Sequence, residues 1–255
     1  MIVDTHAHLN TPDFHDDLDE VLARARQFGV TKTIVIGMNE SANHQAIEMA
    51  RNHDMLFASV GVHPADVDHE TTAHLKHLVR EKEVVAIGEC GIDLYWRKDN
   101  LDTQRRVFIE QIELAVQTGL PLIIHTRNSF PEAYACLLPY RGRVKGVFHC
   151  FSAGLDDARR ALDLGFHIGI GGPVTFPKSY ELTRVVRETD LSWLLVETDS
   201  PYLAPHPYRG KRNEPGYTIH VATAIAAIKG ISVEEVARQT THNAHQLFQL
   251  GGNKT

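Results

Sequence analysis

The sequence is poor in cysteine and has no long apolar run. Its three cysteines, Cys90, Cys136 and Cys150, are odd in number and lack CxxC spacing, which favours reduced thiols in the cytoplasm over a disulfide framework. The longest apolar stretches fall far short of the roughly 20 residues that cross a bilayer, so we expect no transmembrane helix and no membrane partner. The N-terminus also lacks the basic and apolar regions of a secretion signal.

The sequence also lacks an excess of basic residues. With 26 Lys or Arg against 32 Asp or Glu, the chain of 255 residues carries a formal charge of −6. Such a chain has no broad basic surface with which to coat duplex nucleic acid, so any nucleic acid must be bound locally. Histidine, by contrast, is abundant, with 16 residues.

Short apolar runs with strand character alternate with longer segments of helical periodicity along the whole chain. The strands are expected to begin near Ile2, Thr33, Met55, Val84, Pro121, Lys145, Phe166 and Trp193. Their spacing averages about 27 residues, the size of one strand plus its crossover helix. This pattern predicts an α/β fold, a TIM (β/α)8 barrel in a single domain over residues 1–250, with a flexible tail at 251–255. A doubly wound sheet is the alternative, but the first turn has no glycine-rich motif.

Metal-ligand side chains follow five of the predicted strands. They are His6, His8, Glu89, His125, His149 and Asp199. His6 and His8 are two positions apart on one strand, so both imidazoles point to the same side. Because the C-terminal strand ends of a parallel barrel meet at one mouth, all six side chains are expected to gather there.

Six such side chains are more than one metal ion with an open coordination position requires. A carboxylate can bridge two ions, so we predict two divalent metal ions at the barrel mouth. Histidine with carboxylate suits Zn, Mn, Fe or Co, and Mg suits a position richer in carboxylate. Without a cation, the burial of so many polar groups in one barrel mouth would be costly.

Two further residues near the predicted mouth have alternative roles. His63 follows the third strand and is either a loop histidine fixed by the turn before Pro64 or a proton donor to the substrate. Glu197 shares a face with Asp199, where it can orient a water or accept a hydrogen bond from a histidine ligand.

Basic residues near the predicted mouth are candidates for substrate binding. Arg127 lies two residues beyond His125 and offers a fork that suits phosphate oxygens, or it pairs with a neighbouring acid. Arg209, Lys211 and Arg212 form the one dense basic run near the site, within a loop rich in proline, and bind phosphate or form a solvated patch.

Seven ordered motifs resemble those of one known family. The motifs MIVDTHAHLN, GVHP, VVAIGECGIDLYW, PLIIHTR, GVFHCFS, VETDSPYLAP and RGKRNEP are similar to those of the TatD family of metal-dependent hydrolases and deoxyribonucleases. The match runs from residue 1 to about Phe248. The resemblance implies an amidohydrolase-type barrel, a dinuclear metal site and phosphodiester hydrolysis on DNA ends. A small departure is Ala153 before Gly154, where many relatives place glycine directly.

By similarity, the first ion is held by His6, His8 and Asp199, Glu89 bridges, and His125 with His149 holds the second. The expected function is therefore that of a 3′-5′ exonuclease-like deoxyribonuclease on single-stranded or frayed DNA, with Asp199 as the general base and no protein partner.

Two other functions stay open at this point. The same barrel can hydrolyse an ester or amide, as an aminoacyl-tRNA deacylase, lactonase or amidase, because fold and family do not fix the substrate. Many binuclear amidohydrolases bridge their metals with a carboxylated lysine, whereas Glu89 fills that position here. The second alternative, a non-catalytic metal-binding protein, is disfavoured by ligands that mix carboxylate with histidine at an open mouth.

Overall fold

Eight parallel strands form one sheet in sequential order in the computed structural model, which describes residues 1–250. They are β1 (Ile2–Ala7), β2 (Val30–Ile36), β3 (Leu56–Val60), β4 (Val84–Asp93), β5 (Leu122–Arg127), β6 (Gly146–Phe148), β7 (Phe166–Ile170) and β8 (Leu194–Val196). Each begins within three residues of its predicted start. The predicted single-domain TIM barrel is therefore confirmed.

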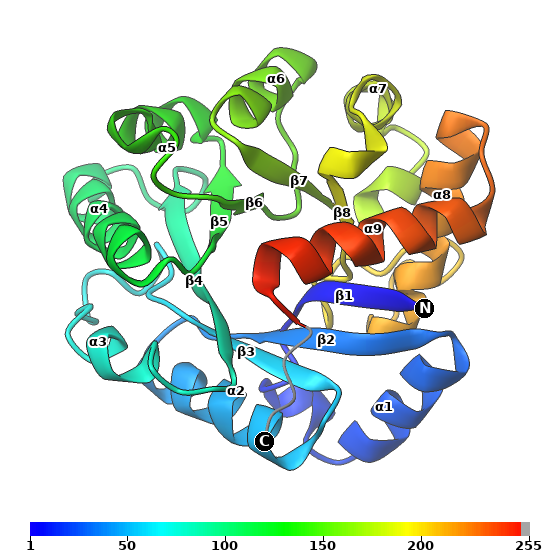
Figure 1. Cartoon of the computed structure of the whole chain (residues 1–255), viewed down its shortest axis with the longest axis horizontal. Helices are drawn as coiled ribbons and strands as arrows, with labels where there is room; N and C mark the ends of the chain where they lie inside the picture. The colour runs from blue at the N-terminus through cyan, green and yellow to red at the C-terminus, as the bar shows by residue number, and fades with distance from the viewer. Residues whose placement is uncertain (251–255) are drawn as a thin grey trace.

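Helices surround the sheet, as the ribbon in Figure 1 shows. They are α1 (Leu18–Gln27), α2 (Glu40–Asn52), α3 (Leu75–Leu78), α4 (Leu101–Thr118), α5 (Phe130–Leu137), α6 (Leu155–Asp163), α7 (Tyr180–Glu188), α8 (Thr218–Lys229) and α9 (Val233–Phe248). The helix α9 is additional to the eight strand and helix units of the predicted pattern. The tail 251–255, expected to be flexible, lies outside the described residues.

The barrel closes where the end of β1 meets the segment that follows β8. Ala7 pairs with Ser200 in a parallel bridge, and the backbone N–H of His8 donates to the carbonyl oxygen of Ser200 at 2.7 Å. The N–H of Asp199 donates to the carbonyl oxygen of His6 at 2.9 Å. Residues at opposite ends of the barrel sequence are therefore neighbours in space.

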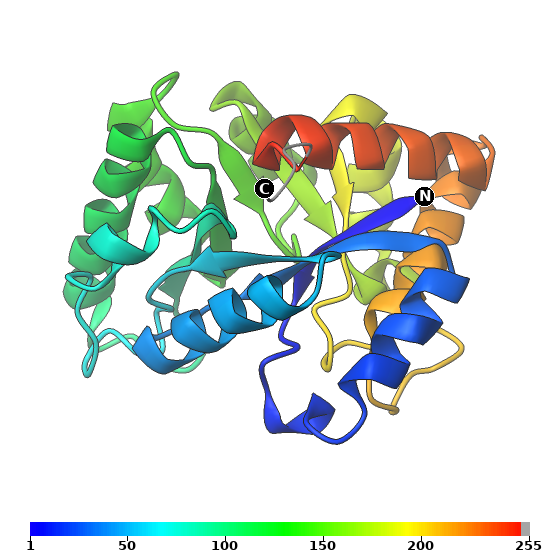
Figure 2. The same ribbon diagram turned by 60° about the horizontal axis from the view of Figure 1, so that its bottom comes forward.

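A second hydrophobic cluster lies within the barrel and includes the C-terminal end of α9. Strand residues such as Ile34, Ile36 and Ile123 pack there with Leu247 and Phe248. The alternation of β2 explains this, because side chains two apart share a face. Figures 1 and 2 both show α9 beside the start of β1, and Thr241 donates a hydrogen bond to the carbonyl oxygen of Met1 at 3.0 Å. The helix α9 thus closes the barrel at the end where β1 begins.

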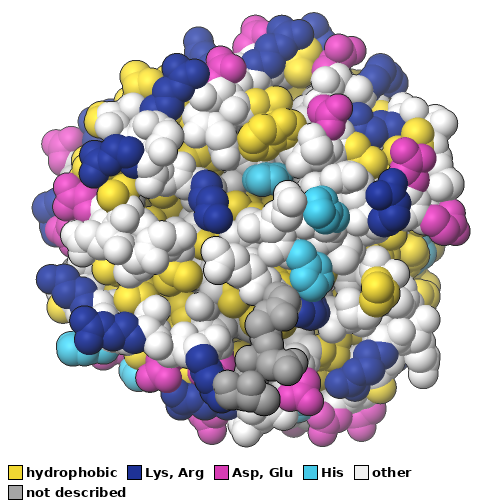
Figure 3. All heavy atoms as spheres, in the orientation of Figure 1, with side chains coloured by type: hydrophobic (Ala, Val, Ile, Leu, Met, Phe, Trp, Pro, Cys, Tyr) yellow, Lys and Arg dark blue, Asp and Glu magenta, His cyan; other side chains and the backbone are white. Residues whose placement is uncertain are grey.

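The face that α9 crosses carries both signs of charge. Figure 3 shows Lys and Arg side chains interspersed with Asp and Glu over this face. Among residues 1–250, no single helix is long and apolar enough to cross a membrane, and only the bent pair 215–229 and 233–248 meets that test when combined.

We expect Leu247→Ala to lower the free energy of unfolding by about 2–5 kcal/mol, the usual cost of a cavity at a buried leucine. Leu247 is 3% exposed, whereas Leu138 is 47% exposed and provides the same substitution as a control. Chemical denaturation monitored by circular dichroism measures both variants. If Leu247→Ala is as mild as Leu138→Ala, packing of α9 is not what closes the barrel.

Candidate metal centre and active site

Four donor atoms from three strand ends converge at the C-terminal mouth of the barrel. Nε2 of His6 lies 3.2 Å from Nε2 of His8, and these two atoms lie 3.4 and 3.6 Å from Oε2 of Glu89. Oδ1 of Asp199 lies 3.5 Å from the His6 nitrogen and 3.3 Å from the His8 nitrogen. The closure of the barrel between β1 and the segment after β8 brings Asp199 to the histidine pair.

These separations fit a shared cation. A tetrahedral shell with metal–ligand bonds of about 2.1 Å places its donors about 3.4 Å apart. The donor set of two imidazoles and two carboxylates is also one that divalent ions such as Zn and Mn accept. The residues present therefore fit a first metal ion.

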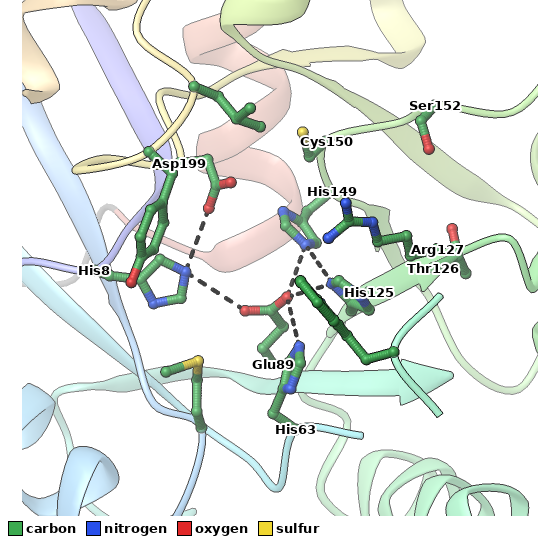
Figure 4. Close-up of a pocket in the computed structure, with 14 residues that line it drawn as sticks. His8, His63, Glu89, His125, Thr126, Arg127, His149, Cys150, Ser152 and Asp199 are labelled. Carbon is green, nitrogen blue, oxygen red and sulfur yellow. Dashed lines mark hydrogen bonds and ion pairs between the residues drawn. The ribbon is translucent and has the colours of Figure 1, made fainter. Parts of the chain in front are cut away.

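A second group of donors surrounds the other oxygen of Glu89. Nε2 of His149 lies 2.8 Å from Oε1, Nδ1 of His125 lies 2.9 Å away, and Nε2 of His63 lies 3.6 Å away. Figure 4 shows the carboxylate of Glu89 between His8 on one side and His125, His149 and His63 on the other. One oxygen faces each group, which is the arrangement expected of a bridging ligand.

An irregularity in β4 aims Glu89 into the mouth. The pairing of β4 with β5 changes register between Ile87 and Cys90, and Glu89 lies within that interval. Gly91 has φ of +135°, and a Cβ there would lie 2.1 Å from the carbonyl oxygen of His125. A residue with a side chain at this position would therefore displace the strand that carries His125.

Histidine charge stabilises the ionised form of Glu89. Burial by itself raises the pKa of this carboxyl, but the neighbouring imidazoles, that of His149 above all, lower it well below its usual value. Burial likewise lowers the pKa of His149, and Glu89 with Glu197 raises it well above its usual value. The buried cluster is thus held together by opposite charges.

Asp93 is a site residue that the sequence analysis missed. Its Oδ2 lies 2.9 Å from Nε2 of His125, on the opposite side of the ring from Glu89. The backbone N–H groups of Tyr95 and Trp96 donate to its Oδ1 at 2.8 and 3.2 Å. Asp93 therefore fixes the orientation of His125. It ends β4, so the strand-end argument would have found it had Glu89 not been taken as the end of that strand.

Glu197 lies behind His149 and is fully buried. Its Oε1 lies 3.5 Å from Nδ1 of His149 and accepts a hydrogen bond from the backbone N–H of Cys150 at 2.6 Å. Of the two predicted roles, this geometry favours acceptance of a hydrogen bond from a histidine ligand.

Asp4, two residues before His6, is a second buried carboxyl that the sequence analysis did not single out. Thr198 donates to it from the backbone N–H at 2.9 Å and from Oγ1 at 2.6 Å. Burial raises the pKa of Asp4 to about 8, so the group is mainly neutral at pH 7. Asp4 therefore connects β1 to the segment that carries Asp199 without adding a further full negative charge to the site.

His63 lies at the mouth with a defined tautomer. Its Nδ1 accepts a hydrogen bond from the backbone N–H of Ala65 at 3.0 Å, so the ring hydrogen of the neutral form lies on Nε2. Burial lowers the pKa of His63 to about 3, so the ring is neutral at pH 7. This arrangement directs an N–H donor toward Glu89.

The converging side chains line a pocket of about 670 Å³, which also includes Trp96, Arg127, Cys150 and Tyr202. The guanidinium of Arg127 lies over the ring of Tyr95, 3.8 Å from its centroid, and 5.5 Å from that of Trp96. Arg127 is thus held by aromatic rings rather than by the neighbouring acid that was its alternative partner.

The structure places the predicted basic loop in two different environments. Arg212 donates to Asp17 at 2.9 and 2.6 Å, so its charge is paired. Arg209 lies over Phe176 at 4.2 Å and lines a neighbouring pocket that shares Cys150 and Ser152 with the histidine pocket. Of the three predicted substrate-binding arginines, only Arg127 lines the histidine pocket among the described residues.

Comparisons with known proteins agree with this geometry. Residues 3–249 match the family model described as "TatD related DNase". A Bacillus subtilis protein named "Uncharacterized metal-dependent hydrolase YabD" is 42% identical, over 98% of this chain and 100% of its own length. The "3'-5' ssDNA/RNA exonuclease TatD" of Klebsiella pneumoniae is 34% identical, over 98% of both chains. The crystal structure of the TatD homologue YjjV from Escherichia coli superposes with a TM-score of 0.91 at 31% identity, over 97% of this chain and 98% of its own. The chain therefore belongs to the TatD family of metal-dependent hydrolases.

Proposed function

We propose that this protein is a nuclease that uses two divalent metal ions to hydrolyse phosphodiester bonds at the 3′ ends of single-stranded DNA. The observation that carries the proposal is the position of Glu89 between two groups of histidines. One of its carboxylate oxygens faces His6 and His8, and the other faces His125 and His149. The description of the family model and the exonuclease name of the Klebsiella pneumoniae relative support the choice of substrate.

The ligands divide between the two ions as follows. His6, His8 and Asp199 would hold the first, Glu89 would lie between the two, and His125 with His149 would hold the second. When bound, the ions would activate water for attack and offset the negative charge that develops on the phosphate. Zn and Mn suit these donors, and Mg is a further candidate.

Asp199 is our candidate for the general base. Burial by itself raises the pKa of its carboxyl, but the hydrogen bond from His8 and the charge on His6 hold the pKa below its ordinary value. The ionised carboxylate lines the pocket, where it can accept a proton from the attacking water. Glu197 is the alternative base, although its contact with Cys150 favours an orienting role toward His149.

His63 and the arginines complete the proposed mechanism. The Nε2–H of neutral His63 can donate a hydrogen bond to the leaving oxygen. Arg127 lines the pocket and presents a forked donor for phosphate oxygens. Arg209 and Arg212 remain candidates for contacts farther along the strand, with the charge of Arg212 already shared with Asp17.

A cytoplasmic location is also part of the proposal. All three cysteines are free thiols, and Cys90 and Cys136 are buried. Free thiols are typical of the reducing cytoplasm.

The first test is metal content. We expect the parent protein, saturated with Mn or Zn and then dialysed, to retain two ions per chain. Glu89→Gln removes the negative charge of the proposed bridging ligand, so this variant should retain fewer than two ions per chain. Glu83→Gln is a matched control. Glu83 is also buried, but it directly precedes β4, at the end of the strand away from the histidines, where it lies 3.7 Å from Arg51. Elemental analysis that finds two ions in the Glu89 variant would contradict the bridging role.

The second test is the general base. Asp199→Asn keeps the size of the side chain but cannot accept the proton, so turnover should fall by roughly 10²-fold or more. Circular dichroism and metal content are measured in parallel, with Asp102→Asn, at a fully exposed side chain, as the control. Near-normal turnover with both ions bound would assign the base to another group, first of all Glu197.

The third test is the substrate. We expect linear single-stranded DNA to be degraded from its 3′ end, and a 3′-blocked strand, a closed circular single strand and duplex DNA to resist. The panel includes aminoacyl-tRNA and simple esters. Rapid hydrolysis of an ester with all DNA substrates intact would replace the nuclease assignment by the deacylase or esterase alternative. Equal cutting of linear and circular strands would exclude action at ends.

A further inference from the structure

Aromatic side chains are unusually exposed near the barrel mouth. Trp96 is 72% exposed and lines the histidine pocket, together with the exposed Tyr202. Tyr180 is 76% exposed and lines the neighbouring pocket of about 610 Å³. Large aromatic rings exposed to water near a binding site are typical of surfaces that stack on a ligand.

The second pocket lies beside the first. The two pockets share Cys150 and Ser152, in the loop between β6 and α6. A strand whose terminal phosphodiester lies at the histidines would have to cross only this loop to reach the second pocket. We call the second pocket the adjoining groove; its lining includes Phe176, Lys178, Tyr180 and Arg209, and one carboxylate, that of Glu181.

The loops that form the adjoining groove are well supported. The backbone N–H of His206 donates to Oγ1 of Thr175 at 2.8 Å, which joins the loop after β8 to the loop after β7. Ser179 donates from Oγ to the carbonyl oxygens of Val174 and Phe176 at 3.2 and 2.8 Å. Hydrogen bonds within and between these loops hold the groove in shape before any ligand binds.

The groove combines rings with two cations, Lys178 and Arg209, against the single carboxylate of Glu181. The guanidinium of Arg209 lies 4.2 Å from the centroid of the Phe176 ring, and Lys178 lies between Phe176 and Tyr180 in the sequence. Single-stranded nucleic acid is bound elsewhere by rings that stack on bases beside cations that contact phosphates. An acidic chain of net charge −6 has to provide such contacts locally.

We infer that the adjoining groove is a subsite for single-stranded DNA, which holds the nucleotides next to the scissile bond while the terminal nucleotide lies at the histidines. Tyr180 and Phe176 stack on bases, and Arg209 and Lys178 contact the backbone phosphates. This inference rests on the proposed nuclease function, and it predicts that affinity rises with strand length until the groove is filled.

The test compares two substrates. One is an oligothymidylate of ten nucleotides, and the other is a small chromogenic phosphodiester, bis(4-nitrophenyl) phosphate, which is too short to reach the groove. We expect Tyr180→Ala and Phe176→Ala each to lower the ratio of kcat/KM for the oligonucleotide to that for the small substrate by roughly 10-fold, through KM. Arg209→Ala should also weaken the salt dependence of oligonucleotide binding. The loss of one phosphate contact should lower the slope of log K against log salt concentration by roughly 0.7 in magnitude.

The chain provides a matched control for the pair of Arg209 and Phe176. Arg143 lies over Tyr140, 5.6 Å from the ring centroid, and neither residue lines either pocket. Arg143→Ala and Tyr140→Ala should leave the ratio and the salt slope at the parent values. If the groove variants behave like these controls, or lower activity on both substrates equally, the subsite is wrong.

Fluorescence anisotropy separates failure of the subsite from failure of the proposed function. The probe is the same oligonucleotide labelled at its 5′ end. It is mixed with one of two metal-loaded proteins, the Asp199→Asn single variant or the double variant that also carries Tyr180→Ala. Weaker binding in the double variant supports the subsite even where no DNA is cut, whereas equal binding overturns it. Absence of DNA cleavage by the parent protein contradicts the nuclease function instead.

Discussion

The carboxylate of Glu89 is the group around which the active site is arranged. It is buried, and a buried carboxylate is costly unless opposite charges and hydrogen-bond donors surround it. Histidines from β1, β5 and the ends of β3 and β6 supply those donors on both of its oxygens. The closed barrel makes this possible, because parallel strands place all of their C-terminal ends at one mouth.

A ring of supporting groups holds those histidines in place. Asp93 faces the outer nitrogen of His125, and Glu197 faces that of His149. Both carboxylates are positioned in turn by backbone N–H groups, from Tyr95 and Cys150 among others. Orientation therefore comes from the backbone of strands and adjoining loops, and α9 supports the same strands from the opposite end of the barrel.

Sequence periodicity was sufficient for the architecture and for most of the polar side chains at strand ends. His6 and His8 could be paired because a strand repeats every two residues, and the strand spacing indicated a barrel. Asp93 was missed because Glu89 was taken as the end of its strand, whereas β4 continues beyond a register change to Asp93, and such an irregularity is not visible as periodicity. The ion pair of Arg212 with Asp17 joins residues 195 positions apart, which no local pattern reports.

The way each arginine is held decides how much charge it offers to a substrate. An arginine in an ion pair must exchange its carboxylate partner for the phosphate when it binds a substrate, so it contributes little net free energy to binding. This describes Arg212, which donates twice to Asp17. Arg212 also lies over a ring, that of Phe14 at 4.9 Å, whereas Arg127 and Arg209 lie over rings and have no ion pair among residues 1–250. A ring orients a guanidinium without neutralising it. In a chain with an overall negative charge, stacking on rings therefore leaves a few cations available at the mouth of the barrel for an anionic ligand.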